Sequence, residues 1–243
     1  MVKQHEILAD LHVHTLTSDT GLSTLHEVLC GARRSGMRYV AITDNEKSCH
    51  QPRIDTLAKI NSETGVKVIP GVEYVEALSE PGTRNGAYAL MGIHPTAITN
   101  SAICTANNYF ENWCNVLQAS NVRTVAHLHK HLPSLLEESE LANFYSLAVS
   151  FIRETNMWIE ISSWSCPQEK RALNHLLSLL EKEKKIELVF GTGAKYCEDV
   201  GRFHDVLELF NTFDIKPKRV ININEMALDK LYNSTRTEQP LNA

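Results

Sequence analysis

The sequence predicts an α/β fold in which seven parallel strands and their helices close into a TIM-barrel-like structure. Apolar segments typical of buried strands alternate along the 243 residues with segments of helical periodicity. Strand–helix units in series are typical of a parallel sheet that helices cover. Polar residues follow almost every predicted strand at its C-terminal end, where barrel active sites are built. An open doubly wound sheet would instead concentrate them at one switch point, so we favour closure.

The N-terminal half contains four predicted strands. The first is an apolar run that ends at His12 and His14, and a helix with Ser23 as its N-cap follows it. The other strands of this half are expected over residues 38–44, 66–73 and 88–95, with a helix around 54–60 and a loop over 80–86.

The C-terminal half contains three more predicted strands. They cover residues 122–127, 158–163 and 187–193, and helices are expected over 108–119, 135–154 and 203–213 and in the segment that ends in the charge run 181–185. Residues 219–223 are interpreted as a short late strand or an extended piece, and a last helix begins at 224. We predict one domain over residues 1–232, followed by a polar tail over 233–243.

Composition argues against several classes of protein. The formal charge of −5 and the pI near 6.1 argue against a sequence-independent nucleic-acid binder, which would carry a basic excess. The chain shows no apolar run of membrane-spanning length and no signal-peptide segment ahead of the first strand. Six scattered cysteines without a C-x-x-C pair are typical of reduced thiols. These features predict a cytoplasmic protein with no membrane partner.

Two histidines close the first predicted strand at spacing i, i+2. Residues two apart on a strand project to the same face, so the imidazoles of His12 and His14 can reach one point in space. Neutral imidazole is the commonest protein ligand for zinc and related metals. In the alternative interpretation, one histidine is a hydrogen-bonded strand-end residue and the other lies on a loop.

Other predicted strands end in residues of the same kind. The second predicted strand ends at Asp44, the third at Glu73 and the fifth at His127, and His94 lies at the end of the fourth. Histidines and carboxylates at separate strand ends are hard to explain by packing alone. Because the C-terminal ends of barrel strands meet around one opening, the pattern predicts a metal site there.

These residues lie in motifs that resemble the PHP (polymerase and histidinol phosphatase) superfamily of metal-dependent phosphoesterases. The motifs, in chain order, are Asp10-Leu11-His12-Val13-His14-Thr15, Ile42-Thr43-Asp44, Pro70-Gly71-Val72-Glu73, Gly92-Ile93-His94, Ala126-His127 and the segment from Gly191 to Lys195. The resemblance covers nearly the whole chain. The order of the motifs looks most like that of the compact stand-alone bacterial phosphatases of this superfamily. It implies a distorted seven-stranded (β/α) barrel and a site for as many as three metals.

The resemblance implies five metal ligands. His12, His14 and Glu73 would hold a first ion, and Glu73 would bridge to a second ion held by His94 and His127. Zinc is the expected ion, and manganese and iron are the alternatives.

Other positions depart from the family's pattern. The ligands of the third metal fall near Thr20, at Asn45 and at Lys195, and Gly193 stands where an aspartate would complete the first metal site. We therefore expect one or two ions and not three. One hypothesis is that the Lys195 ammonium replaces the third cation and neutralises a phosphate oxygen. The alternative is that Lys195 is a surface lysine in a decayed motif.

Substrate contacts are predicted from residues beside these motifs. Asn45 and Arg84, the latter on a glycine-rich loop, could meet a phosphate. His129 and Lys130 stand close to His127 and are candidates for the same role. We nevertheless favour solvated loop positions for His129 and Lys130.

Together the motifs predict a metal-dependent phosphoesterase that hydrolyses a small phosphorylated substrate. Glu73, Asp44 and Lys195 form the predicted catalytic group, in which Asp44 supports the site without binding a metal. Two cations about 3.5–4 Å apart would activate a bridging water and polarise the phosphoryl group. The alternative is a catalytically inactive PHP fold retained as a binding or regulatory protein. A metal-dependent amidohydrolase shares the first motif, but the later pattern of that class is not evident.

Overall fold

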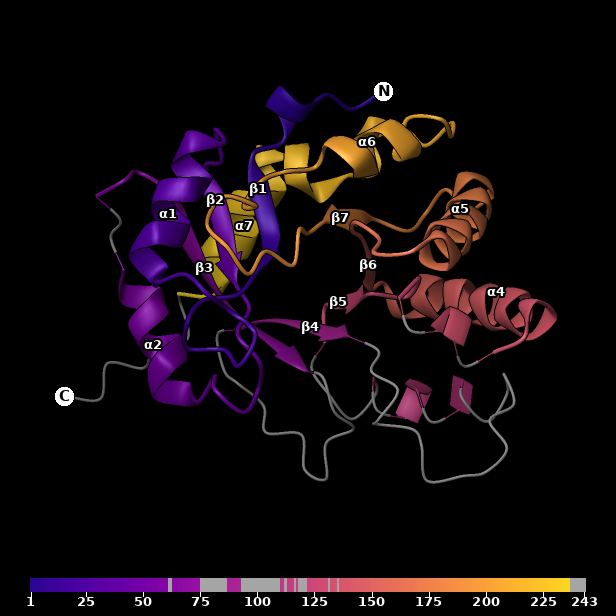
Figure 1. Ribbon diagram of the computed structural model, residues 1–243, viewed down its shortest axis with the longest axis horizontal. Helices are drawn as coiled ribbons and strands as arrows, with labels where there is room; N and C mark the ends of the chain where they lie inside the picture. The colour runs from indigo at the N-terminus through magenta and orange to yellow at the C-terminus, as the bar shows by residue number, and fades with distance from the viewer. Residues whose placement is uncertain are drawn as a thin grey trace.

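Seven parallel strands, arranged in chain order, form a nearly closed barrel in the computed structural model (Figure 1). The structure describes residues 1–60, 63–74, 87–92, 110–111, 113–115, 117, 122–130, 132–134 and 136–236. The strands are β1 (Ala9–Val13), β2 (Tyr39–Ile42), β3 (Lys67–Tyr74), β4 (Tyr88–Gly92), β5 (Thr124–Ala126), β6 (Trp158–Ile161) and β7 (Leu188–Phe190). This arrangement confirms the predicted TIM-barrel-like α/β fold.

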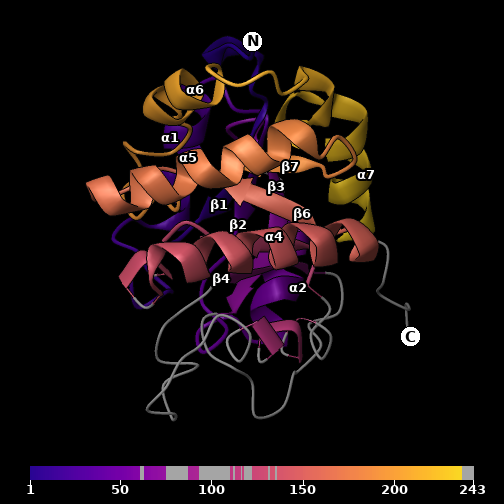
Figure 2. The same cartoon turned by 90° about the vertical axis from the view of Figure 1, so that its right-hand side faces the viewer.

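Helices surround the barrel. They are α1 (Leu25–Arg34), α2 (Gln51–Lys59), α4 (Glu138–Thr155), α5 (Pro167–Lys182), α6 (His204–Phe210) and α7 (Glu225–Ser234). The described residues also form short 3₁₀ turns, which are η1 (Gln4–Glu6), η3 (Leu132–Ser134), η4 (Pro217–Arg219) and η5 (Ile221–Ile223). Helices α1 and α2 lie beside β2 and β3, whereas α4 and α5 lie side by side outside β6 and β7 (Figure 2).

Two apolar layers stabilise the barrel. One lies between the strands and the surrounding helices, and the other fills the interior with side chains that include Tyr39, Leu90 and Val189. In that interior, the buried hydroxyls of Tyr88 and Thr124 form a hydrogen bond with each other, at 2.7 Å. Because the interior is filled, the barrel has a packed core and not a pore, and polar function belongs at its ends.

Asn222 closes the gap between β7 and β1. Its buried side-chain amide donates to the carbonyl oxygens of Ala9 and Phe190, at 2.9 and 2.8 Å, and accepts from the Phe190 N–H at 2.6 Å. Backbone hydrogen bonds between residues 12–14 and 193–194 continue the closure toward the C-terminal strand ends. The segment after β7 is therefore held directly against the first histidine motif.

Helix α7 covers the N-terminal end of the barrel. Asp229 on this helix accepts from Lys67 Nζ at 2.6 Å and from the Tyr39 hydroxyl at 2.8 Å. Lys67 begins β3 and Tyr39 begins β2, so these contacts tie the helix to the starts of two strands. The strand ends that carry the predicted site residues lie at the other end.

The first helix begins one residue later than the predicted cap. Thr24 is the N-cap of α1: its Oγ1 accepts from the Glu27 N–H at 3.3 Å, and the Glu27 carboxylate accepts from the Thr24 N–H at 2.7 Å. This reciprocal capping box needs an acidic residue three positions after the cap, which Ser23 lacks. The Ser23 hydroxyl instead accepts from the Cys197 N–H at 3.0 Å.

The segment 219–223 is mostly turn. Pro217 begins η4, and η5 follows after Val220, whose backbone is extended and forms a single parallel bridge with Leu188. The N–H groups of Val220 and Asn224 close these turns on the carbonyls of Pro217 and Ile221, at 2.8 and 2.9 Å, and so do not pair with a neighbouring strand. The predicted late strand is thus reduced to one extended residue.

Several predicted boundaries fall at or beyond the described residues. The described part of the helix expected over 108–119 is helical, and the loop expected over 80–86 lies outside the described residues. Helix α7 continues to Ser234, past the predicted start of the tail, and the extent of the domain stays a prediction. Within the described ranges, the cysteines form no disulfide. None of the helices described is both long and apolar enough to span a membrane.

Candidate metal centre

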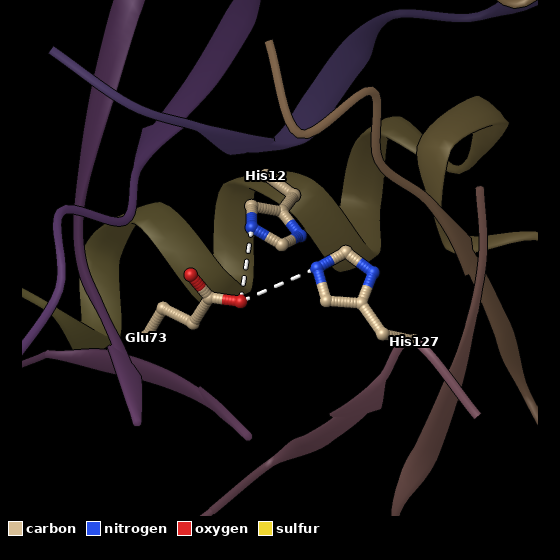
Figure 3. A group of neighbouring side chains, drawn as sticks. All are labelled: His12, Glu73 and His127. Carbon is tan, nitrogen blue, oxygen red and sulfur yellow. Dashed lines mark ion pairs between the residues drawn. The ribbon is translucent and has the colours of Figure 1, made fainter. Parts of the chain in front are cut away.

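The carboxylate of Glu73 lies among three imidazoles at the C-terminal strand ends. Figure 3 shows two of them, those of His12 and His127. Glu73 Oε1 is 3.5 Å from His12 Nε2 and 3.3 Å from His127 Nε2, and Oε2 is 3.4 Å from His14 Nε2. His12 on β1 and His14, the first residue after it, also approach each other, with 3.1 Å between their Nε2 atoms. Four of the five predicted metal ligands are therefore brought together.

The spacing of these atoms suits a metal ion. Ligand atoms of His12, Glu73 and His127 lie within 4.8 Å of one another. Two ligands about 2.0–2.1 Å from a tetrahedral zinc ion are about 3.4 Å apart, which matches the separations around Glu73. Imidazole nitrogens with a carboxylate are also a donor set that catalytic zinc sites use.

Glu160 on β6 orients His12 from behind. Nδ1 of His12 is 3.0 Å from Glu160 Oε2, so the imidazole donates through Nδ1 and directs Nε2 toward Glu73. Both side chains are fully buried. Such a carboxylate–histidine pair fixes the ring orientation and tautomer of a metal ligand.

Close packing at Gly191 makes room for this pair. A Cβ atom built on Gly191 would lie 2.5 Å from the Cβ of His12 and 2.8 Å from Glu160 Oε1. These separations are far inside van der Waals contact. Only glycine fits at this point of the segment after β7, which explains why the motif begins with it.

Charge and burial shift the pKa values of the cluster's side chains in different directions. Burial alone would lower the pKa of His12, but the Glu160 and Glu73 carboxylates raise it to about 10. Although burial opposes ionisation of both carboxyls, His12 lowers the pKa of Glu160 to about 2 and holds that of Glu73 well below its usual range. Burial lowers the pKa of His14 to about 4 and also lowers that of His127. The imidazole of His14 is thus kept neutral, as a metal ligand must be, whereas His12 would release a proton on binding an ion.

His127 occupies an unusual backbone conformation. Its φ is +59°, in the left-handed region that few residues other than glycine adopt. The strand β5 ends one residue earlier, and the Lys130 N–H closes the turn on the His127 carbonyl at 2.9 Å. Backbone strain of this kind persists where the surrounding structure imposes it, often at functional sites. Here it directs Nε2 toward Glu73.

Asp10 anchors the segment that follows β7. Its buried carboxylate accepts from Thr192 Oγ1 at 2.6 Å, from the Thr192 N–H at 3.1 Å and from the Gly201 N–H at 2.9 Å. Burial raises the pKa of Asp10 to about 6 against the effect of these hydrogen bonds. The residue thus holds both ends of the segment 192–201 beside the histidines.

Asp44 lies outside the group of ligand atoms found in the described ranges, and its role as a support of the site stays a prediction. Its carboxylate accepts from the Thr15 N–H at 2.7 Å and from Thr15 Oγ1 at 2.8 Å, and Arg53 pairs with it at 3.3 Å. Thr15 follows His14 directly, so these contacts position the loop after β1. Sequence reasoning missed Arg53, because α2 brings it to Asp44 from a separate element.

Asn45 and Lys195 flank His14. The Asn45 N–H donates to Ser18 Oγ at 3.4 Å, and that hydroxyl is 3.5 Å from His14 Nδ1. Asn45 Oδ1 is buried and has no hydrogen-bond partner among the described residues. Lys195 is exposed, and after burial and the neighbouring imidazoles its positive charge is a further cause of the lowered pKa of His14.

The position at Gly193 lies beside the cluster without contributing to it. Its N–H donates to the His12 carbonyl at 2.8 Å, and a Cβ built there would be 3.9 Å from His127 Cε1. A side chain at this position would face the ligands, but glycine supplies no carboxylate.

His129 is buried, so the expectation of a solvated loop position is wrong for it. The turn after β5 directs it inward, where its Nε2–H donates to the Ser163 carbonyl at 3.2 Å. Burial lowers the pKa of His129 to about 4. Lys130 is half-buried, and the predicted contributions of His94 and Arg84 lie outside the described residues.

Comparison with known proteins places the chain beside phosphatases. No family model matches it. It is similar to a protein of Shewanella loihica named "Probable phosphatase", with 24% identity over 241 residues that cover 92% of each chain. A "Probable phosphatase" of Acetivibrio thermocellus is also 24% identical, over 245 residues that cover 93% of this chain and 95% of that protein.

Two solved structures share the fold. The histidinol phosphate phosphatase of Lactococcus lactis, in complex with zinc, L-histidinol and phosphate, aligns with a TM-score of 0.61 at 13% identity, over 86% of this chain and 94% of that one. A chain of an archaeal ribonuclease P with mature tRNA aligns with a TM-score of 0.57 at 12% identity, over 93% and 90%. At these identities the likeness shows the fold alone.

Proposed function

We propose that the protein is a metal-dependent phosphoesterase of the PHP superfamily that hydrolyses a small phosphate ester. The relatives named probable phosphatases, which are similar along nearly their whole length, support the reaction class. The zinc and phosphate in the complex of the structural neighbour support the choice of metal and ligand. The site would hold one or two divalent ions, zinc first, because the donors include imidazoles and a carboxylate.

The convergence of three imidazoles on Glu73 is the observation that carries the proposal. His12, His14, Glu73 and His127 would hold the metal, with His94 as the further predicted ligand. The ion would supply a Lewis acid that lowers the pKa of a water molecule and balances charge on the phosphoryl group. A purely structural role for the cluster is disfavoured by its position at the open end of the barrel.

The chain's own residues would prepare the site for this chemistry. Glu160 holds His12 with Nε2 toward Glu73, and Asp44 holds the loop that follows His14. Lys195 would place a positive charge near the phosphoryl oxygens, where negative charge develops during hydrolysis. These groups need little reorganisation, because their partners already hold them in place.

Metal analysis and turnover together test the proposal. The purified protein is expected to contain one or two equivalents of zinc, manganese or iron and to hydrolyse at least one member of a panel of phosphate monoesters and diesters. His127→Ala should abolish turnover and lower metal content, whereas His5→Ala, at an exposed histidine of η1, should change neither. A metal-free protein that is inert toward the whole panel would overturn the proposal and favour a binding or regulatory role.

A further inference from the structure

A hollow opens beside the candidate metal centre, next to the segment that follows β7. Its volume is about 360 Å³, within the range of small-molecule sites. Gly193 lies in its wall, and a Cβ built on Gly193 would be 3.9 Å from His127 Cε1, so this one residue adjoins both the hollow and the cluster. A second hollow, of about 450 Å³, adjoins the first and shares with it the lining residues Ser163, Arg202, Asp205 and Val206.

Apolar side chains form much of the wall. Ala194, Phe203 and Val206 are buried there, and Tyr196 lines the hollow while remaining 51% exposed. Phe203 is fixed by its contact with Phe190, 5.9 Å between ring centroids, so this side of the hollow is rigid. A half-exposed aromatic ring over a rigid apolar wall offers a face on which another ring can stack.

Exposed apolar residues lie on the backbone next to the segment that lines the hollow. Within the described ranges, five large apolar side chains are more than half exposed, and three of them are Leu16, Leu22 and Tyr196. The Leu22 N–H donates to the Lys195 carbonyl at 2.8 Å, and the Leu16 N–H donates to the Ser23 carbonyl at 2.7 Å. The loop after β1 and the segment after β7 therefore carry these side chains on adjoining backbone.

The charged groups of the hollow lie at its edge. Arg202 and Asp199 pair with each other at 3.2 Å, with side chains 67% and 49% exposed, and so offset one another's charge. Asp205 is exposed on α6. Lys195 is the lining cation nearest in sequence to Gly193 and would face the phosphoryl group in the proposed reaction. The buried side chains of the lining are the apolar ones, Ala194, Phe203 and Val206.

We propose that this hollow binds the alcohol portion of the ester and selects an apolar, ring-bearing group that stacks on Tyr196. This inference rests on the proposed phosphoesterase function, because the phosphoryl group would be anchored at the cluster. Stacking on Tyr196 and burial of the ring should give such an ester a higher kcat/KM than an ester with a short alkyl group. Added apolar contact in a pocket raises kcat/KM about tenfold or more.

The test compares two esters whose leaving groups are both primary alcohols. The wild-type protein is expected to hydrolyse 2-phenylethyl phosphate with kcat/KM about tenfold above that for ethyl phosphate. Tyr196→Ser should lower this ratio about fivefold or more, and Tyr196→Phe should retain it. Met226→Ser, which removes another exposed apolar side chain at the helix covering the opposite end of the barrel, should leave the ratio unchanged.

Binding of phosphonates separates this inference from the proposed function. Calorimetry with 2-phenylethylphosphonate and ethylphosphonate measures the same preference as a difference in affinity, without hydrolysis. A protein that hydrolyses no ester would therefore contradict the proposed phosphoesterase function, while the ligand preference of the hollow could still be measured. A preference in binding that Tyr196→Ser removes supports the inference. Equal affinity for the two phosphonates, or a preference that survives Tyr196→Ser, overturns it.

Discussion

The carboxylate of Glu160 lies 3.0 Å from Nδ1 of His12, and both side chains are shielded from water inside the barrel. This contact holds the imidazole so that its other nitrogen faces Glu73, 3.5 Å away. The buried pair comes from β6 and β1, which lie far apart in the sequence. The orientation of the first histidine motif therefore depends on a residue outside every motif that identifies the site.

Replacing Glu160 by glutamine should weaken the metal centre without removing a ligand. Glutamine keeps the size of the side chain but loses the charge that favours the Nδ1–H tautomer of His12. Partners of this kind are typically worth about 10–100-fold in metal affinity or activity. We expect a loss of that size in zinc affinity, measured by competition with a chelator.

Glu187→Gln is the matched control, because Glu187 accepts from Trp158 Nε1 at 2.8 Å and Trp158 begins β6, at the other end of that strand. It should leave zinc affinity unchanged. Equal zinc affinities for Glu160→Gln and the wild type would contradict the positioning role of Glu160.

Burial of His129 should make folding stability depend on pH. Burial lowers its pKa from 6.5 to about 4 in the folded state. Between these values the unfolded chain takes up a proton that the folded chain does not, so stability falls as the pH drops, by about 1.4 kcal/mol per pH unit. His129→Gln keeps an N–H donor for the Ser163 carbonyl but removes this titration.

Urea unfolding at pH 7 and pH 5, with metal removed by a chelator, measures the difference. From pH 7 to pH 5 the wild type should lose about 2 kcal/mol more stability than His129→Gln. His5→Gln, at an exposed histidine, should behave as the wild type does. Equal losses of stability in the wild type and His129→Gln would contradict the prediction, because His129 would then take up its proton equally in the folded and unfolded chains.

Local patterns predicted most of the cluster. His12 and His14 share a face because strands have a period of two, and Glu73 and His127 follow from the rule that barrel sites form at strand ends. Glu160 was missed because it lies within a strand, although a single charged residue in the apolar run Trp158–Ile161 was a usable signal.

The orientation of His129 could not be read from any local pattern. It follows from the left-handed backbone of His127, at a φ of +59°, which turns the chain inward after β5. Its hydrogen-bond partner, the Ser163 carbonyl, lies on the segment after the next strand. A contact between separate strand ends is a property of the closed barrel and has no periodicity in the sequence.

Lys195 should contribute charge to turnover and not to folding. Its side chain is exposed, and its carbonyl already accepts from the Leu22 N–H, so truncation leaves that backbone contact in place. We expect Lys195→Ala to lower kcat/KM for phosphate esters about tenfold, and Lys195→Arg to restore part of it, because an ammonium or guanidinium balances phosphoryl charge.

The loss should shrink at high ionic strength, since an exposed charge is screened over about 8–10 Å. Lys218→Ala, at an exposed lysine of η4, is the control and should keep full activity. Turnover of Lys195→Ala at the parent rate would leave Lys195 as a surface lysine without a role in the reaction.

Gly193 offers a way to complete the candidate metal centre. Its φ is +61°, and a Cβ there would lie 3.9 Å from His127 Cε1 with nothing closer. Aspartate tolerates the left-handed region better than most residues, at a cost of about 1 kcal/mol. Gly193→Asp should therefore fold and add a carboxylate beside the imidazoles, and we expect zinc affinity to rise about tenfold or more.

Gly193→Asn isolates the effect of the charge, because asparagine has the same size and meets the same backbone strain. Chelator competition on both variants measures zinc affinity, and urea unfolding measures the cost of the backbone conformation. Stability should fall alike in the two variants, while zinc affinity should rise in Gly193→Asp alone. If the aspartate and asparagine variants bound zinc equally, the side chain at 193 would not reach the ion. An aspartate at this position would then not complete the first predicted metal site.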